Sequence, residues 1–338
     1  MSTFGSSVAG SVNIVSLDDI REARVRLDGI TVRTPLIPLE WDGRKLYLKP
    51  ENLQPIGAFK LRGAYNKIAS LSDDERARGV ITYSSGNHAQ GGAYAGRALG
   101  TKAVIVMPRN APAVKREATA ALGAEIVFVG PSGVERQVKA EQLAAEHGYV
   151  IIPPYDDEKI IAGQGTAGLE ILEDLPEVDL VLVPIGGGGL ISGISTAIKS
   201  LKPDAKVIGV EPELAADAQA SFRAGHIVKF PAEQVLSTSA DGLRSQYVGT
   251  ITFEHIRRYV DDVVTVSEDD ILNAVKILAG NPKTAAEPSG AVATAAWLFH
   301  RESLPKSDLT VAVISGGNID PELLKKVLSS DHSALTSR

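Results

Sequence analysis

The sequence predicts an α/β fold made of two doubly wound lobes with mostly parallel sheets. Short runs rich in Val and Ile alternate with longer helical segments, and glycine clusters follow several of these runs. Runs that are apolar throughout are typical of parallel strands buried on both faces, which helices must connect. The predicted strands cover residues 80–83, 103–107, 125–129, 149–152, 180–183, 207–210 and 309–314.

Helical segments are expected between these strands. The first is an Ala- and Gly-rich segment that follows Gly86, and the second comes shortly after Pro108. A chain of 338 residues is long enough for about two domains. The expected large domain covers residues 1–55 and 158–338, and the expected small domain covers residues 56–157. The predicted helices cover 86–100, 113–122, 134–147 and 166–174, and another begins near Ile191.

Composition and charge exclude several classes of protein. Apolar residues make up 44% of the chain and charged residues 22%, which allows a large core and argues against disorder. The net charge is −6 and no basic block stands out, so nucleic acid is not an expected partner. Because there is no cysteine, the chain has no disulfide, thiolate nucleophile or cysteine metal ligand.

No segment has the pattern of a signal peptide or a membrane span. No lysine or arginine precedes Arg21, and a signal peptide needs a positively charged start. The longest apolar stretch, residues 181–198, is interrupted by four consecutive glycines, which indicates a strand, a turn and a helix. We therefore expect a cytoplasmic protein with no membrane partner.

The glycines Gly186, Gly187, Gly188 and Gly189 stand between a predicted strand and a predicted helix. Glycines allow a ligand to approach the backbone closely, and the positive end of the helix dipole favours an anion such as phosphate. A turn needed only for packing would require one or two glycines. The segment is not a Walker loop, and Ile191 replaces the third glycine of the dinucleotide-binding fingerprint. We expect a phosphate site here.

Lys60 follows a turn that contains proline and glycine, at an expected helix start. A helix N-terminus and burial both disfavour an ammonium ion. A lysine whose pKa is lowered can bind an aldehyde covalently and can move protons. An arbitrary lysine is usually a solvated surface residue, so the motifs around Lys60 must decide its role.

The segment E-N-L-Q-P-I-G-A-F-K-L-R-G-A, which contains Lys60, resembles the cofactor-lysine motif of the fold type II pyridoxal-phosphate enzymes. The threonine/serine dehydratases and serine racemase are the members that it resembles most. Further motifs follow in the order of that family, from T-P-L at Thr34 to S-G-G-N at Ser315, so the resemblance spans nearly the whole chain. It implies a tryptophan synthase β-like fold with pyridoxal 5′-phosphate in the cleft between the lobes.

The resemblance also implies roles for residues that would hold the cofactor. Lys60 would bind it covalently, Phe59 would pack beside its ring, and Asn87 would hydrogen-bond its phenolic oxygen. The glycines at 186–189, together with Leu190, would bind its phosphate.

Ser315, at the end of the last predicted strand, would face the pyridine nitrogen of the cofactor. A neutral hydroxyl at this point makes the ring a weaker electron sink than a carboxylate would, and a weaker sink suits β-elimination better than transamination. The alternative is a serine that only caps a turn at the strand end.

The segment S-S-G-N-H resembles the loop that holds the substrate carboxylate in this family. Its expected position between a strand and a helix independently supplies N–H donors for a carboxylate. A histidine in such a place, considered without the motif, would more often be structural. The loop consists of Ser84, Ser85, Gly86, Asn87 and His88.

The segment E-P-E-L-A-A-D resembles the divalent-cation site of serine racemase and some dehydratases. The ligands would be the carboxylates of Glu211 and Asp217 and the backbone carbonyl of Ala215. Oxygen ligands completed by water suit Mg²⁺ or Ca²⁺. A solvated acidic loop without a metal is an equally open alternative.

The chemistry implied by the resemblance is removal of water and then ammonia from L-threonine or L-serine, with Lys60 as the general base. The expected partner is therefore a small β-hydroxy amino acid, and a homodimer is the expectation from the family. Ser85 and the segment E-P-S-G at Glu287 resemble serine racemase, whereas P-P-Y-D-D at residues 153–157 resembles the catabolic threonine dehydratases. Serine racemase and 3-hydroxyaspartate dehydratase activities stay open as alternatives.

Two other classes of protein compete with this interpretation. One is a nicotinamide oxidoreductase that uses the glycine loop and Glu211, against which the missing third glycine argues. The other is a binding protein without catalysis on the same fold. The joint presence of Lys60, the S-S-G-N-H loop and Ser315 argues against it.

Overall fold

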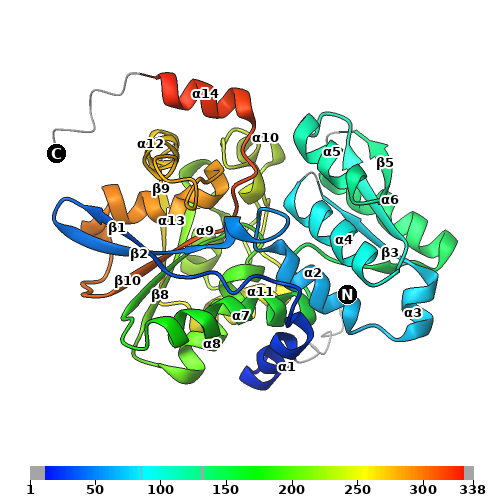
Figure 1. Ribbon diagram of the computed structural model, residues 1–338, viewed down its shortest axis with the longest axis horizontal. Coiled ribbons are helices and arrows are strands. Elements are labelled where there is room, and N and C mark those ends of the chain that lie inside the picture. The colour runs from blue at the N-terminus through cyan, green and yellow to red at the C-terminus, as the bar shows by residue number, and fades with distance from the viewer. Residues whose placement is uncertain (1–11, 85, 131–132, 331–338) are drawn as a thin grey trace, which may run out of the picture.

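The computed structural model describes residues 12–84, 86–130 and 133–330. These residues form two sheets, one of six strands in the order β1-β2-β10-β7-β8-β9 and one of four strands in the order β5-β4-β3-β6. Figure 1 shows the sheets in two lobes, with the four-stranded lobe on the right. The strands are β1 (Ile37–Trp41), β2 (Arg44–Pro50), β3 (Val80–Tyr83), β4 (Ala103–Pro108), β5 (Glu125–Val129), β6 (Val150–Ile151), β7 (Leu180–Pro184), β8 (Lys206–Pro212), β9 (Asp262–Val266) and β10 (Thr310–Ile314).

Helices connect most of the strands and cover the sheets. The α-helices are α1 (Leu17–Leu27), α2 (Lys60–Ala69), α3 (Asp73–Arg78), α4 (Asn87–Ala98), α5 (Ala113–Ala121), α6 (Gly133–His147), α7 (Glu158–Asp174), α8 (Gly189–Leu201), α9 (Asp217–Ala224), α10 (Ala232–Val235), α11 (Thr250–Tyr259), α12 (Glu268–Leu278), α13 (Pro288–Phe299) and α14 (Pro321–Ser329). Short 3-10 helices are η1 (Glu51–Leu53), η2 (Glu213–Ala215), η3 (Asp241–Leu243) and η4 (Arg301–Ser303).

The six-stranded sheet is buried on both faces. Its strands are parallel except for β1, which pairs antiparallel with β2 at one edge. Along β7, Leu180 and Leu182 join a core cluster that includes much of α13, whereas Val181 and Val183 join a cluster that includes α8. Successive side chains of a strand point to opposite faces, so a strand that is apolar throughout requires this double cover.

The four-stranded sheet is parallel throughout. Val104 and Val106 of β4 pack with Ala140 of α6, and Ile105 and Met107 of the same strand pack with Ala89 of α4. This sheet is therefore also covered by helices on both faces, as the alternation of helices and strands in the sequence predicts.

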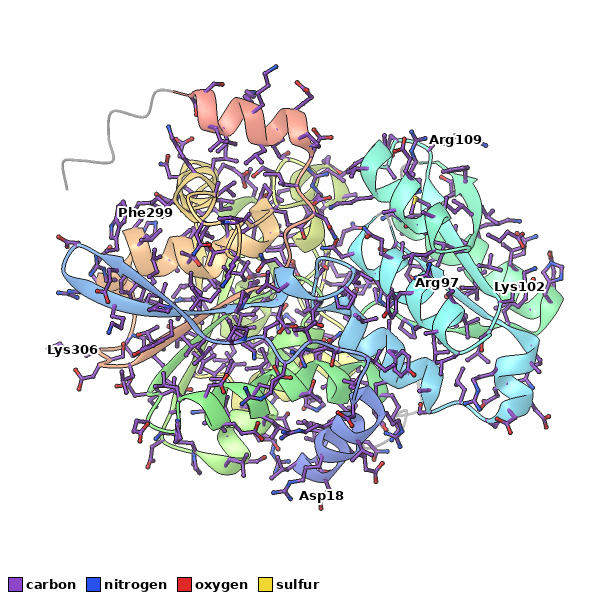
Figure 2. All side chains as sticks on the ribbon, in the orientation of Figure 1. Asp18, Arg97, Lys102, Arg109, Phe299 and Lys306 are labelled. Atoms are coloured by element: carbon purple, nitrogen blue, oxygen red, sulfur yellow. The ribbon has the colours of Figure 1, made fainter. Side chains whose placement is uncertain are left out.

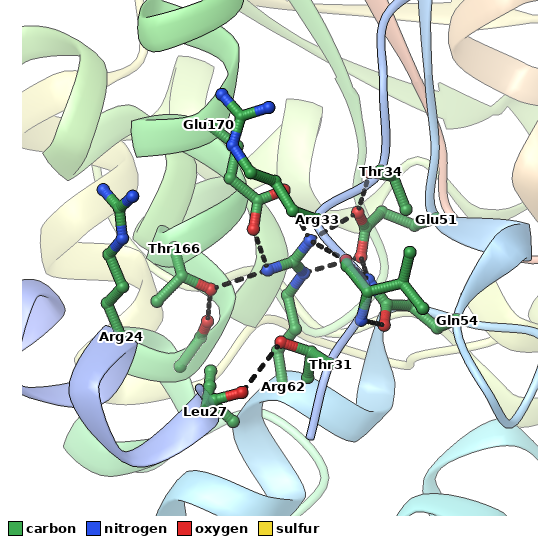
Figure 3. A network of polar contacts seen from close by, with 12 residues as sticks. Arg24, Leu27, Thr31, Arg33, Thr34, Glu51, Gln54, Arg62, Thr166 and Glu170 are labelled. Atoms are coloured by element: carbon green, nitrogen blue, oxygen red, sulfur yellow. Dashed lines mark hydrogen bonds and ion pairs between the residues drawn. The ribbon is translucent and has the colours of Figure 1, made fainter. Parts of the chain in front are cut away.

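A buried network of charges fixes α2 against the six-stranded lobe (Figure 3). The Arg62 guanidinium donates to Glu51 at 2.7 and 2.8 Å and to Glu170 at 2.7 and 2.8 Å. Nζ of Lys49 lies 2.6 Å from the Glu170 carboxylate, and Thr34 donates to Glu51 at 2.8 Å. Burial alone would lower the pKa of Arg62, but the two carboxylates raise it. Two cations and two anions thus compensate one another in the interior of the protein.

The fold confirms the α/β class with two lobes, with differences at individual elements. The seven predicted strands are present, but β1, β2 and β9 were not predicted. β2 contains Arg44, Lys45 and Lys49, so it lacks the Val- and Ile-rich run that marks the other strands. Helix α7 begins at Glu158 rather than at residue 166, because Asp157 caps it by accepting hydrogen bonds from the N–H groups of Lys159 and Ile160.

Charged side chains lie on the outside of both lobes (Figure 2), as Asp18, Lys102 and Lys306 illustrate. Both signs occur on this surface, in keeping with the absence of a basic block from the sequence. Among the described helices, none combines the length and the apolar character that crossing a membrane requires.

Candidate active site

A cavity lies between the two lobes, next to the carboxyl ends of β3, β7 and β10, where α/β sheets commonly bind ligands. It brings together nearly all the residues that the sequence assigned to the cofactor and to the substrate carboxylate. Those that line it are Phe59, Lys60, Ser84, Gly86, Asn87, His88, Gly186, Gly187, Gly188, Gly189, Leu190 and Ser315. The remaining predicted residue, Ser85, falls outside the described residues.

Lys60 is the first residue of α2, as the turn before it predicts. Its Nζ donates a hydrogen bond of 2.6 Å to the backbone carbonyl of Pro154 and lies 5.1 Å from the centre of the Phe59 ring. Burial lowers the pKa of Lys60 to about 8. In about one tenth of the protein molecules Lys60 is therefore a neutral amine at pH 7, a far larger fraction than for a solvated lysine.

The segment before Lys60 pairs with the segment that follows β10. The N–H of Phe59 donates to the carbonyl of Ser315 at 3.0 Å, and the N–H of Gly317 donates to the carbonyl of Gly57 at 2.9 Å. Gly57 has a φ of +71°, in the left-handed region that favours glycine, and a Cβ there would lie 2.4 Å from the Asn318 side chain. This pairing places Lys60 beside Ser315, although the two are far apart in the sequence.

The four glycines connect β7 to the N-terminus of α8. A Cβ on Gly187 would lie 2.2 to 2.3 Å from the Tyr155 ring, so this ring packs directly on the loop. The carbonyl of Gly187 accepts a hydrogen bond of 2.7 Å from Oγ1 of Thr252, which orients the peptide. The N–H groups of the first helical turn have no partner within α8 and are suited to an anion.

Asn87 is the first residue of α4, and both polar atoms of its side-chain amide form hydrogen bonds. Its Nδ2 donates to Oε1 of Glu287, and its Oδ1 accepts a hydrogen bond of 2.8 Å from Nδ2 of Asn318. These two bonds fix the orientation of the amide and leave one N–H of Nδ2 for a further acceptor.

His88 is buried, and its Nε2 lies 3.1 Å from the carbonyl of Ile152. Burial and the nearby Lys60 lower the pKa of His88 to about 3, so the ring is neutral. Because the ring nitrogen that contacts a carbonyl must carry the hydrogen, the proton is on Nε2 and Nδ1 is an acceptor. His88 therefore brings no positive charge to the substrate loop, and its N–H holds the loop against Ile152.

Ser315 follows β10, and its Oγ donates a hydrogen bond of 3.2 Å to the carbonyl of Ser289. It is buried against the cavity, where its hydroxyl offers a neutral partner to a ring nitrogen. The acidic side chains among the described lining residues are Asp241 and Glu287, and both contact Lys115.

Sequence reasoning missed several residues of the cavity, most of which have no mark in the local sequence. Lys115 belongs to α5, and Asp241 belongs to η3 on the other lobe. Tyr155 covers the glycine loop, and Arg136 lines the cavity from α6. The P-P-Y-D-D motif was the available signal for Tyr155, whereas a lysine or an arginine in a helix is ordinarily a surface residue.

The proposed cation ligands Glu211 and Asp217 lie outside the lining of the cavity, and both are buried rather than solvated. Glu211 accepts hydrogen bonds from the N–H groups of Ala218 and Gln219 at 3.0 and 2.8 Å. Neither carboxylate oxygen of Asp217 has a hydrogen-bond partner in the described structure. Burial raises the pKa of Asp217 to about 8, and burial and Asp217 together raise that of Glu211.

A cation would compensate these two buried carboxylates, so the residues fit the implied metal site. The described residues contain no group of three His, Cys, Asp or Glu side chains suited to a metal ion. Further ligands would therefore have to come from the carbonyl of Ala215, in the buried end of η2, and from water.

The cavity combines a lysine of lowered pKa with a glycine-lined helix N-terminus on two α/β lobes, which defines an enzyme site for an aldehyde cofactor that carries a phosphate. Residues 27–316 match the family described as "Pyridoxal-phosphate dependent enzyme", and the chain belongs to this family. The match confirms the resemblance found in the sequence motifs.

Two relatives and one solved structure are similar to this chain along most of its length. The L-threonine ammonia-lyase of Thermotoga maritima is 45% identical over 94% of this chain and 79% of its own. The L-threo-3-hydroxyaspartate ammonia-lyase of Saccharomyces cerevisiae is 41% identical over 94% of this chain and 98% of its own. The structure of maize serine racemase has a TM-score of 0.88 and 39% identity, covering 93% of this chain and 97% of that chain.

Proposed function

We propose that this enzyme eliminates water and then ammonia from L-threonine and L-serine, giving 2-oxobutanoate and pyruvate. The observation that carries the proposal is the Lys60 amine, with its pKa lowered to about 8, in one cavity with the glycine loop and Ser315. The similarity to an L-threonine ammonia-lyase over 94% of the chain supports this choice of substrate.

The residues of the cavity fit pyridoxal phosphate. Lys60 would hold its aldehyde carbon, the glycines at 186–189 its phosphate, Asn87 its phenolic oxygen and Ser315 its ring nitrogen. When bound, the cofactor withdraws electrons from the α-carbon of the substrate. The neutral hydroxyl of Ser315 limits this withdrawal, which favours loss of a β-leaving group over transamination.

The substrate and its protons are handled by the protein. The N–H groups at the start of α4 bind the α-carboxylate. Nζ of Lys60 takes the α-proton as a general base, and the Pro154 carbonyl, 2.6 Å away, accepts a hydrogen bond from the resulting ammonium. The Cα–H and Cβ–O bonds break, the leaving hydroxyl takes up one proton in exchange for the one removed from the α-carbon, and water leaves. Hydrolysis of the released enamine, through its imine, consumes one water and yields the 2-oxo acid and ammonia.

Lys60→Ala tests the proposal. We expect the variant to lose the visible absorbance that wild-type protein gains with pyridoxal phosphate, and to lose at least about 10³-fold in ammonia release from L-threonine. Lys45→Ala, which removes an exposed lysine from β2, is the control and keeps both properties. Equal absorbance and equal ammonia release in both variants would overturn the assignment of Lys60.

Serine racemase activity is a second candidate, favoured by Ser85 and by the similarity to maize serine racemase. A serine on the face opposite Lys60 would exchange a proton with the α-carbon from that side. Ser85→Ala would then abolish formation of D-serine from L-serine and leave formation of pyruvate within about threefold of wild type. Loss of both activities together would assign Ser85 to substrate binding instead.

We also propose that Glu211, Asp217 and the Ala215 carbonyl bind Mg²⁺ or Ca²⁺ in a structural or activating role. The buried carboxylate of Asp217, which lacks a hydrogen-bond partner in the described residues, supports this. Either ion should raise the melting temperature of the chelator-treated protein, and Asp217→Asn should remove that response. An unchanged response in the variant would exclude the site.

The domain division and the assembly are further proposals. The four-stranded sheet lies within residues 56–157 and the six-stranded sheet outside them, which supports a small domain with these bounds. The family resemblance supports a cytoplasmic homodimer. Sedimentation equilibrium of the purified protein tests the homodimer. Fractionation of the cells that produce the protein tests the cytoplasmic location.

A further inference from the structure

The segment that follows β6 passes from the four-stranded sheet to α7 and runs along the cavity. The carbonyl of Pro154 in this segment accepts the hydrogen bond of 2.6 Å from Nζ of Lys60. The next residue, Tyr155, packs its ring on Gly187, and a Cβ on Gly189 would lie 3.1 Å from Cβ of Tyr155. Tyr155 therefore touches the glycine loop at two points.

Asp156, the residue after Tyr155, caps α11, although the two are far apart in the sequence. Its Oδ2 accepts a hydrogen bond from the N–H of Thr250 at 3.0 Å, and its Oδ1 accepts from the N–H groups of Ile251 and Thr252 at 2.8 and 3.2 Å. The N-cap residue Gly249 has no side chain for these bonds, and a Cβ on it would lie 2.2 Å from the Asp156 carboxylate. A distant carboxylate thus takes the place of the usual N-cap side chain.

The first turn of α11 is in turn joined to the glycine loop. The carbonyl of Gly187 accepts a hydrogen bond of 2.7 Å from Oγ1 of Thr252 and one of 3.3 Å from the N–H of Gly249. The C=O and N–H of a trans peptide point in opposite directions, so this carbonyl turns the N–H of Gly188 away from α11. Gly188 lines the cavity, and an N–H group binds an anion only when it points toward the anion.

We propose that Asp156 is a positioning residue for the phosphate of the cofactor. It holds the first turn of α11, from which Thr252 holds the Gly187 peptide, and it keeps Tyr155 on the loop. The inference rests on the proposed function in one respect, the phosphate in the glycine loop. Asp156 should therefore govern the binding of the phosphate and leave the imine of Lys60 unaffected.

The test compares two ligands on the full-length, cofactor-free protein. Pyridoxal has the same aldehyde as pyridoxal phosphate but no phosphate, and both give a visible absorbance when they form the imine with Lys60. Asp156→Ala should weaken the binding of pyridoxal phosphate by about tenfold, the size of effect that the loss of one helix cap has. The affinity for pyridoxal should stay within about twofold of wild type, because no phosphate contact is involved.

Asp157→Ala is the matched control. Asp157 is half-buried like Asp156 and caps a helix as well, but the helix is α7, and its carboxylate also pairs with Lys67 at 2.7 Å. Because both variants remove a helix cap, both should lower the melting temperature by a similar amount, about 1–3 °C. The control should bind both ligands within about twofold of wild type.

Two further variants separate positioning from general support of the fold. Asp156→Asn keeps a side-chain oxygen that can accept from the start of α11, so the affinity for pyridoxal phosphate should return to within about threefold of wild type. Asp156→Ala should have a smaller effect when it is made in a Thr252→Val protein, because the route through the Thr252 hydroxyl is already lost.

An equal loss of affinity for the two ligands in Asp156→Ala would overturn the inference, and so would an unchanged affinity for pyridoxal phosphate. The same loss in Asp157→Ala, or full additivity of Asp156→Ala with Thr252→Val, would show that Asp156 only supports the fold. Wild-type protein that forms no imine with either ligand would instead refute the proposed function.

Discussion

The Nζ atom of Lys115 lies 2.6 Å from Oδ2 of Asp241 across the cavity, joining α5 of the four-stranded lobe to η3 of the six-stranded lobe. The same nitrogen lies 3.2 Å from Oε2 of Glu287, whose other oxygen accepts a hydrogen bond from Asn87. Burial disfavours the charge of Lys115, but Glu287 and Asp241 raise its pKa to about 12. This cation therefore holds the two walls of the active site together across the whole physiological range of pH.

Lys115→Met should destabilise the protein and weaken substrate binding. The variant leaves Asp241 and Glu287 as neighbouring carboxylates without their cation, although Asp241 can still be hydrated because a quarter of its side chain is exposed. We expect a loss of about 2 kcal/mol in the free energy of unfolding and a rise of about tenfold in KM for L-threonine. Urea denaturation and steady-state kinetics measure the two effects.

The double variant Lys115→Met with Asp241→Asn is the control for this ion pair. Removing one of the two uncompensated carboxylates should restore part of the stability, so the two changes should not be additive. Strict additivity would show that the ion pair does not couple the lobes.

The lowered pKa of Lys60 should govern how fast the cofactor-free protein binds pyridoxal phosphate. The neutral amine reacts with the aldehyde, so the rate should rise with pH and reach half its maximum near pH 8. With Nα-acetyl-lysine as the control, the rise should continue to above pH 10, as expected for a solvated lysine. The visible absorbance after mixing measures both rates, and a protein curve that follows that of the model amine would contradict the effect of burial.

Arg62→Met should cost about 3–5 kcal/mol of the free energy of unfolding, because it removes the buried guanidinium that pairs with both Glu51 and Glu170 (Figure 3). Arg24→Met is the matched control. Arg24 pairs with Glu173 on the surface, where both side chains are well exposed, and its loss should cost less than about 1 kcal/mol. Similar urea midpoints for the two variants would mean that the buried network contributes no more than a surface ion pair.

Gly187→Ala should weaken cofactor binding by about tenfold or more, since the new Cβ would lie 2.2 to 2.3 Å from the Tyr155 ring and must displace either the ring or the loop. Gly186→Ala should have a smaller effect, because its nearest contact would be 3.2 Å. A second change, Tyr155→Ala, should restore room and recover part of the affinity lost in Gly187→Ala. Equilibrium titration with pyridoxal phosphate provides the affinities, and equal affinities in both single variants would contradict the steric argument.

The residues proposed to hold the cofactor could be picked out of the sequence because they belong to local motifs. The glycines at 186–189 lie between a strand and a helix, Lys60 begins a helix after a turn, and Ser315 ends a strand. Each arrangement is set by a few neighbouring residues. Lys115 and Arg136 could not be recognised in this way, since an amphipathic helix with a basic residue has the same pattern whether that residue meets solvent or another lobe.

The sequence by itself determined the chemical groups available to this protein: a lysine after a turn at a helix start, four glycines between a strand and a helix, a neutral hydroxyl at a strand end and no thiol. The tertiary structure decided where those groups lie relative to one another and how far burial shifts their pKa values. The hydrogen bond between Phe59 and Ser315 brings the lysine to the end of β10, and burial there lowers its pKa to about 8. Desolvation and long-range pairing depend on which segments fold against one another, so they arise only when the two lobes close on a common cavity.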